Sequence, residues 1–196
     1  MKYLLYLLFL SAAFLPLSAQ NFGGGLIVGF NASQIDGDAF SGFNKAGLSI
    51  GGFVDYEIAK NLLFQPELIF DQLGSANNAE PLAKMGYITV PLMLNLTLPV
   101  SIGNTTQEIQ FHAGPAVGVL LYGRDGFNLD ISDDLKQQDI RALGGIAYHF
   151  GRVSLSVRYG YSLFSLVKGG RSSILFPLGG PYHNYVNFGL RFHILD

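Results

Sequence analysis

The chain has 196 residues, of which 13% are charged and 49% hydrophobic, with 25 glycines and a formal net charge of −2. This length fits one domain, and the composition is too apolar and too rich in glycine for an ordinary water-soluble enzyme. The sequence has no run of basic residues that could bind the phosphates of a nucleic acid. It has no cysteine, which excludes disulfides, thiolate metal sites and cysteine nucleophiles.

The first twenty residues, MKYLLYLLFLSAAFLPLSAQ, have the pattern of a secretory signal peptide. One early cation, Lys2, precedes an apolar run that ends at Leu15, and the small residue Ala19 follows. The run is too short for a transmembrane helix, and no later segment approaches the roughly 18 apolar residues that such a helix needs. We therefore expect cleavage of residues 1–19, which leaves residues 20–196 as one domain. Any membrane span in that domain must consist of strands.

Eight later segments alternate strictly between apolar and other residues, and Gly, Asn, Asp or Pro bound each of them. One face of every segment is apolar and free of charge, while the opposite face holds the charged residues and many glycines. A period of two residues predicts β-strands. In chain order the apolar series cover residues 26–30, 48–58, 62–70, 88–98, 109–121, 140–150, 153–163 and 186–194.

Eight such strands can close into a barrel, and alternation alone does not show which of their two faces lies inside it. Several segments are long enough for tilted strands that cross a bilayer, which need about 9–11 residues. A barrel of eight strands has a narrow lumen, which suits the face with charges and glycines better than the uniformly bulky face. Short connections at 59–61 and 151–152 also alternate with longer ones such as 33–44, 74–83, 123–137 and 167–181. These features predict that the apolar face meets lipid.

We therefore predict an all-β fold: an eight-stranded antiparallel up-and-down transmembrane β-barrel, preceded by the cleaved signal peptide. Both termini and the short turns are expected on the periplasmic side, with four longer loops outside. Proline removes a donor from a central strand, so we expect local bulges at Pro66, Pro91 and Pro115. Aromatic residues near segment ends are expected at the level of the lipid headgroups; these are Tyr56, Tyr148, Phe150, Tyr159 and Tyr161.

The inward charges predict a polar network in the lumen, because buried charges must be paired. Acids fall on the second and third segments and arginines on the last three. An alternative is that the same groups line a path for protons or ions. The predicted network consists of Asp55, Glu57, Glu67, Asp71, Arg141, Arg158 and Arg191.

Two long loops suggest contacts with ligands or partners. The acidic loop 123–137 favours a solvated surface over a Ca²⁺ or Mg²⁺ site, because its ligand order is not that of an EF-hand. The loop SILFPLGGPY, residues 173–182, either contacts a partner or folds onto the rim. We predict no metal ligand and no cofactor. The apolar residues of the second loop are Ile174, Leu175, Phe176 and Leu178.

A lipid-modifying enzyme is an alternative, because His183 follows a loop that contains Ser172 and Ser173. The loop lacks a nucleophile setting such as G-x-S-x-G, so we predict no catalytic residue.

Five pieces of the sequence together resemble the PorT-like family of small outer-membrane β-barrels of Bacteroidetes. The pieces are FQPELIFDQLG, YITVPLMLNL, HAGPAVGVLL, GGIAYHFGRVSLSVRYGYSL and NYVNFGLRF. The resemblance implies an outer-membrane location, and the family's namesake is associated with type IX secretion.

From these features we expect a non-enzymatic outer-membrane protein that contacts lipid and acts as an envelope scaffold or an accessory of protein secretion. Its partners would be envelope or secretion proteins rather than nucleic acid. The alternatives are the lipid-modifying enzyme and a small ion or solute channel.

Overall fold

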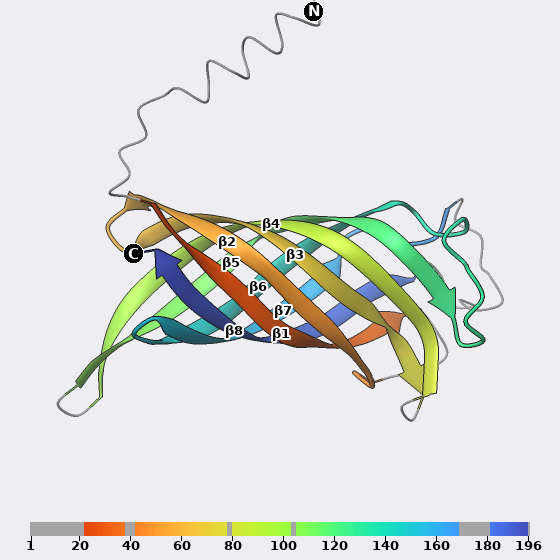
Figure 1. The fold of residues 1–196 in the computed structure, drawn as a ribbon, viewed down its shortest axis with the longest axis horizontal. Helices are drawn as coiled ribbons and strands as arrows, with labels where there is room; N and C mark the ends of the chain where they lie inside the picture. The colour runs from red at the N-terminus through yellow and green to blue at the C-terminus, as the bar shows by residue number, and fades with distance from the viewer. Residues whose placement is uncertain (1–21, 38–41, 78–79, 103–104, 169–180, 196) are drawn as a thin grey trace, which may run out of the picture.

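The computed structural model describes residues 22–37, 42–77, 80–102, 105–168 and 181–195. Each strand pairs antiparallel with the next, and β8 closes the sheet onto β1 (Figure 1). This confirms the predicted eight-stranded antiparallel barrel. The expected signal peptide lies outside the described residues. The strands are β1 (Phe22–Asp36), β2 (Lys45–Ala59), β3 (Leu62–Asn77), β4 (Glu80–Ile102), β5 (Thr105–Asp125), β6 (Gln138–Phe150), β7 (Val153–Ser162) and β8 (Tyr182–Leu195).

The outer surface of the barrel is apolar, and β4 shows how its sequence produces that surface. Val90, Leu92 and Leu94 are exposed, whereas Met93 and Asn95 between and beside them are buried. Successive side chains of a strand point to opposite faces, so the predicted phase is correct in this strand. Within the described residues, no helix is long and apolar enough to cross a membrane.

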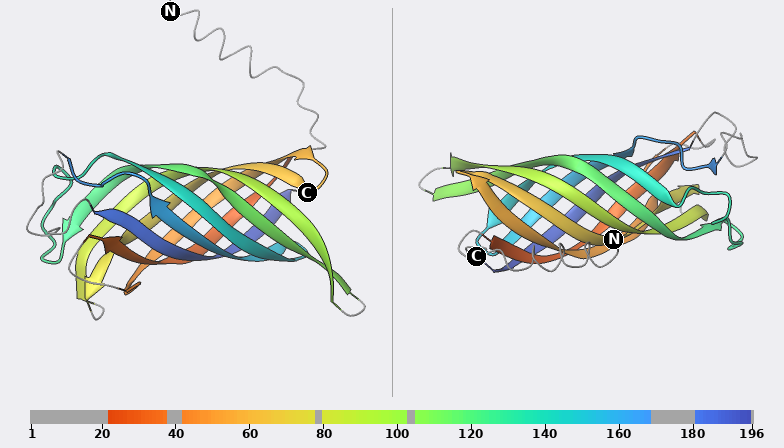
Figure 2. Two further views of the ribbon diagram at one scale, coloured as in Figure 1. Left: turned by 180° about the vertical axis from the view of Figure 1, so that it is seen from behind. Right: turned by 90° about the horizontal axis from the view of Figure 1, so that it is seen from above.

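The two ends of the barrel differ. The turn end carries the β2–β3, β4–β5 and β6–β7 connections, and the first residues of β1 and the last of β8 lie there too (Figures 1 and 2). Asn61 and Gly151 adopt positive φ in two of these turns, at 66° and 61°. The loop end carries the other four connections.

One of the four expected long loops is replaced by strand. β3 extends to Asn77 and β4 starts at Glu80, so the expected loop 74–83 becomes a hairpin. The β4–β5 hairpin is also longer than expected. β4 continues beyond Leu96, the partner of the first residue of β3, and β5 begins before Glu108, the first of its residues that pairs with β6. Figure 1 shows this hairpin projecting beyond the turn end.

The expected bulges at the three prolines are absent from the described strands. Pairing is interrupted beside Pro66, Pro91 and Pro115, but only toward the preceding strand, and the register is the same before and after each gap. The N–H and C=O of one residue point to the same neighbouring strand in an antiparallel sheet, so a proline loses bonds on one side alone. Toward the next strand, the partners Leu92, Ala116 and Ala142 remain paired.

Inward-facing glycines allow the strands of this narrow barrel to come close together. A Cβ on Gly51 would lie 2.8 Å from the Cα of Ile69, and a Cβ on Gly29 would lie 2.9 Å from the Cα of Gly189. These neighbours are backbone atoms, which cannot move aside without breaking the sheet. Glycine at these positions is therefore required by packing, not only by the small volume of the lumen.

Aromatic rings pair on both ends of the outer surface. At the turn end, Tyr148 and Phe150 lie with ring centroids 4.4 Å apart. At the loop end, Tyr161 and Tyr182 stack at 6.0 Å. Such rings favour the level of the lipid headgroups.

Candidate functional site

The lumen contains a first charge cluster nearer the turn end, which we name the Glu67 cluster. Arg158 donates two hydrogen bonds to the Glu67 carboxylate, at 2.7 and 2.8 Å, and Arg191 donates a third at 3.2 Å. Gln65 donates to the same carboxylate at 2.6 Å and accepts from Asn95 at 2.6 Å. All five side chains are buried. One carboxylate therefore holds two guanidinium groups together across the barrel.

A second cluster, the Arg141 cluster, lies nearer the loop end. The fully buried Arg141 donates to Asp139 at 2.6 Å and lies 3.7 Å from the Asp71 carboxylate. Its guanidinium also packs 4.7 Å from the centroid of the Tyr87 ring. Asp71 in turn accepts from Ser49 at 2.9 Å. Asp71 comes from β3 and Arg141 from β6, so this cluster too spans the lumen.

Asp55 lies beside a histidine, whereas arginines were the predicted partners of the acids. Its carboxylate lies 4.0 Å from Nδ1 of His193 at the turn end. The Ser154 hydroxyl lies between two imidazoles, 3.3 Å from Nε2 of His193 and 2.8 Å from Nδ1 of His149. A chain of polar groups from β2, β6, β7 and β8 therefore lies at this end of the lumen.

Glu57 is the member of the predicted network that the structure places elsewhere. Its side chain is exposed, because Glu57 lies two residues before the end of β2 at Ala59, at the turn end of the barrel. Its pairing with Leu63 keeps the register of the earlier residues of β2, and the register shift follows it. Glu57 therefore lies at the rim and not in the lumen.

The loop-end half of the lumen holds an apolar plug that the sequence analysis missed. Leu135 from the β5–β6 connection and Leu166 and Val167 from the β7–β8 connection are buried there. The backbones of the two loops join by an antiparallel bridge between Leu135 and Val167 and by a 2.6 Å hydrogen bond from the N–H of Lys136 to Leu166. The signal in the sequence was a lone leucine in a polar run. The strands supply the rest of the plug: Ile35, Leu73, Ala83, Met85, Tyr87, Met93, Ala116, Leu120, Leu143 and Tyr185.

Uncharged polar residues of the lumen, which were not predicted as a site, extend the Arg141 cluster. Asn187 donates to Asn31 at 2.8 Å, and Asn31 donates to Asp71 at 3.1 Å. These residues share the inward phase of their strands, which is the signal that identifies them. They connect β8 and β1 to the Arg141 cluster.

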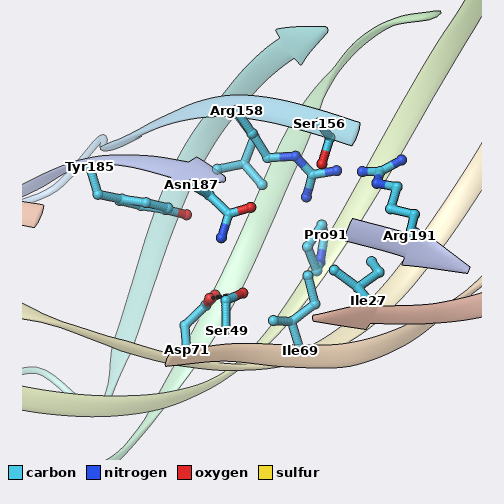
Figure 3. Close-up of a pocket in the computed structure, with 11 residues that line it drawn as sticks. Ile27, Ser49, Ile69, Asp71, Pro91, Ser156, Arg158, Tyr185, Asn187 and Arg191 are labelled. Carbon is cyan, nitrogen blue, oxygen red and sulfur yellow. Dashed lines mark hydrogen bonds between the residues drawn. The ribbon is translucent and has the colours of Figure 1, made fainter. Parts of the chain in front are cut away.

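A small cavity lies between the two charge clusters (Figure 3). It is large enough for about one water molecule. Asp71 and Ser49 line one side in Figure 3, and the guanidinium groups of Arg158 and Arg191 lie near Ser156 on the other. The polar lining suits an ordered water that bridges the two clusters.

His183 is the second residue of β8, but its side chain points into the lumen. It is fully buried, and its Nε2 lies 3.1 Å from the Tyr87 hydroxyl. Ser172 and Ser173 lie outside the described residues, as do Ile174, Leu175, Phe176 and Leu178. Within the described chain, no group of three or more His, Asp or Glu residues is arranged to hold a metal ion.

The acidic loop uses its carboxylates on its own backbone. Asp125 accepts from the N–H groups of Phe127 and Leu129, at 3.0 and 2.8 Å. Asp130 accepts from the N–H of Ser132 at 2.9 Å. Hydrogen bonds from the side chain and then from the backbone N–H of Ser132 lower the pKa of Asp130, so the carboxylate is charged at neutral pH.

Comparison with known proteins places this barrel among outer-membrane proteins. The model of the family described as "Outer membrane protein beta-barrel domain" matches residues 18–168, more than half of the chain. Comparison with curated proteins gave no significant match.

The chain is also similar, at low sequence identity, to several solved structures. Neisserial surface protein A is 13% identical with a TM-score of 0.48, over 87% of this chain and 96% of that one. Ail of Yersinia pestis, solved with the heparin analogue sucrose octasulfate, is 9% identical with a TM-score of 0.47, over 89% and 100%. AlkL, solved in DMPC bilayers, is 14% identical with a TM-score of 0.36, over 93% and 96%. By the family match, the chain belongs to the outer membrane protein beta-barrel domain family.

Proposed function

We propose that this protein is a closed, non-enzymatic outer-membrane barrel that serves as a scaffold or accessory component of the cell envelope. The observation that supports the proposal is the filled lumen. The Glu67 cluster, the Arg141 cluster and the apolar plug occupy successive levels of it. A barrel of about eight strands has an interior just wide enough for side chains. A filled lumen leaves the two rims as the surfaces that act on partners.

Planar bilayers that contain the purified barrel are expected to stay at baseline conductance. The paired charges and the apolar plug occupy the lumen, and a continuous water path would require their side chains to move apart. A larger porin in the same bilayers is the positive control for insertion and detection. Reproducible unitary steps from this barrel would contradict the proposal and favour the small channel.

The burial of His183 supports the non-enzymatic proposal over the lipid-modifying enzyme. A residue that acts on lipid at the rim must reach the headgroup, and this ring packs against Tyr87 inside the barrel, with centroids 5.4 Å apart.

The finer role in secretion of the type IX kind rests on the sequence resemblance to PorT-like barrels. A crosslinked pull-down of the tagged protein from its native outer membrane is expected to recover secretion or other envelope components. Recovery of the barrel alone, in good yield, would contradict the accessory role.

A further inference from the structure

The β5–β6 connection carries two apolar side chains that project far from the barrel. Phe127 is 87% exposed and Leu129 is 64% exposed, the highest values among the large hydrophobic residues of the described chain. The apolar residues of the barrel wall are less exposed, because neighbouring strands cover their sides. We name residues 125–130 the Phe127 tip.

Hydrogen bonds hold the backbone of the Phe127 tip in one conformation. Asp125 donates its N–H to the carbonyl of Leu129 at 3.0 Å, and its own carbonyl accepts from the N–H of Asn128 at 3.0 Å. The Asp125 carboxylate binds the N–H groups of Phe127 and Leu129. In the next residue pair toward the barrel, the N–H of Ile131 donates to the carbonyl of Gly123 at 2.9 Å. The two apolar side chains therefore stand on an ordered base, which reduces the entropy lost when they bind a partner.

The surroundings of the tip are acidic. Residues 124–136 contain Asp125, Asp130, Asp133 and Asp134 and the two cations Arg124 and Lys136. Lys168 from the β7–β8 connection adds a third cation, because its ammonium donates to the Asp133 carbonyl at 2.8 Å, so the acids still outnumber the cations. The Arg124 guanidinium lies 3.2 Å from the side-chain oxygen of Asn128 within the tip. A surface of net negative charge is repelled by anionic lipid headgroups and attracted by a basic protein surface.

We propose that the Phe127 tip is a docking site for a protein partner whose surface has an apolar pocket bordered by Lys and Arg side chains. Phe127 and Leu129 fill the pocket, and the aspartates of the loop pair with its basic border. Aromatic residues, Phe included, are enriched in protein interfaces, and an ordered base lowers the entropy cost of binding. This inference rests on the proposed accessory function and names the surface and the chemistry of the partner.

The test begins with a photo-crosslinking amino acid at position 127 in the full protein, in its native outer membrane. The matched control carries it at Phe43, an exposed aromatic on the β1–β2 connection. A protein adduct is expected at position 127 and not at position 43. The captured protein is then purified, and its Kd for the barrel in nanodiscs of neutral lipid is measured.

The double variant Phe127→Ser/Leu129→Ser is expected to weaken this Kd by about tenfold or more. Phe43→Ser should leave the Kd within about twofold, and the Kd should rise with salt. The replaced side chains are exposed, so the unfolding curve of the variant should match the wild type, and Phe127→Tyr should retain binding.

The absence of a protein adduct at position 127, an adduct with lipid, or equal affinity of the double variant would each overturn the docking site. These results are independent of the bilayer measurement. A closed barrel without a binding tip overturns only the docking site, whereas a conducting barrel that binds through Phe127 overturns only the closed-barrel function.

Discussion

Replacement of Glu67 by Gln is expected to lower the free energy of unfolding by roughly 3–5 kcal/mol, because it removes one partner from a buried set of charges. The Glu67 carboxylate contacts both Arg158 and Arg191, and both guanidinium groups are buried. Glutamine keeps the size of the side chain but removes its charge. Two buried cations then repel each other without the carboxylate that bridges them.

Urea titration of the refolded barrel in lipid vesicles measures this change. Glu57→Gln is the matched control, because Glu57 is exposed at the rim of the same barrel. Its effect is expected within about 0.5 kcal/mol. If both variants unfolded at the same urea concentration, the Glu67 cluster would not stabilise the barrel.

Leu92→Arg is expected to lower the free energy of unfolding in a bilayer by about 2–4 kcal/mol, the effect of arginine on a lipid-facing barrel position near the midplane. Leu92 is exposed in the middle of the apolar series of β4. A guanidinium there must leave water for hydrocarbon, or distort the bilayer to keep water.

Ile58→Arg is the matched control, since Ile58 is also exposed and apolar but lies near the end of β2. Arginine near the interface is expected to cost about 0–1 kcal/mol. The comparison uses the same urea titration in vesicles. Equal tolerance of arginine at both positions would mean that the middle of the outer face does not contact hydrocarbon.

The lumen and the outer face together explain why this chain is both apolar and charged. Hydrocarbon demands that every backbone N–H and C=O be paired inside the protein, which a closed sheet achieves. The charges are excluded from the lipid side and must then pair with one another inside. The filled interior stabilises the barrel, and it moves the expected contacts with partners to the loops and turns.

The number of strands and the inward phase of β4 could be predicted from the sequence, because a period of two residues is a local property. The short connections added the antiparallel order, since they can join only strands that run in opposite directions. The sequence also predicted that acids from β2 and β3 would face arginines from β6 to β8. Sequence alone did not say which charges pair. The structure joins Glu67 to Arg158 and Arg191 but turns Asp55 toward His193, because pairing depends on the level that each side chain reaches in the barrel.

Three further features depend on contacts between strands and loops and could not be predicted from local patterns. Glu57 keeps the inward register of β2 but lies at the turn-end rim, where its side chain is exposed. The prolines keep their register, since each loses bonds to one neighbouring strand only. Leu135, Leu166 and Val167 enter the lumen although they lie in loops without alternation. Their burial results from contacts between segments far apart in the chain. The lone leucine in a polar run marks Leu135, but no local pattern identifies the segment that it contacts.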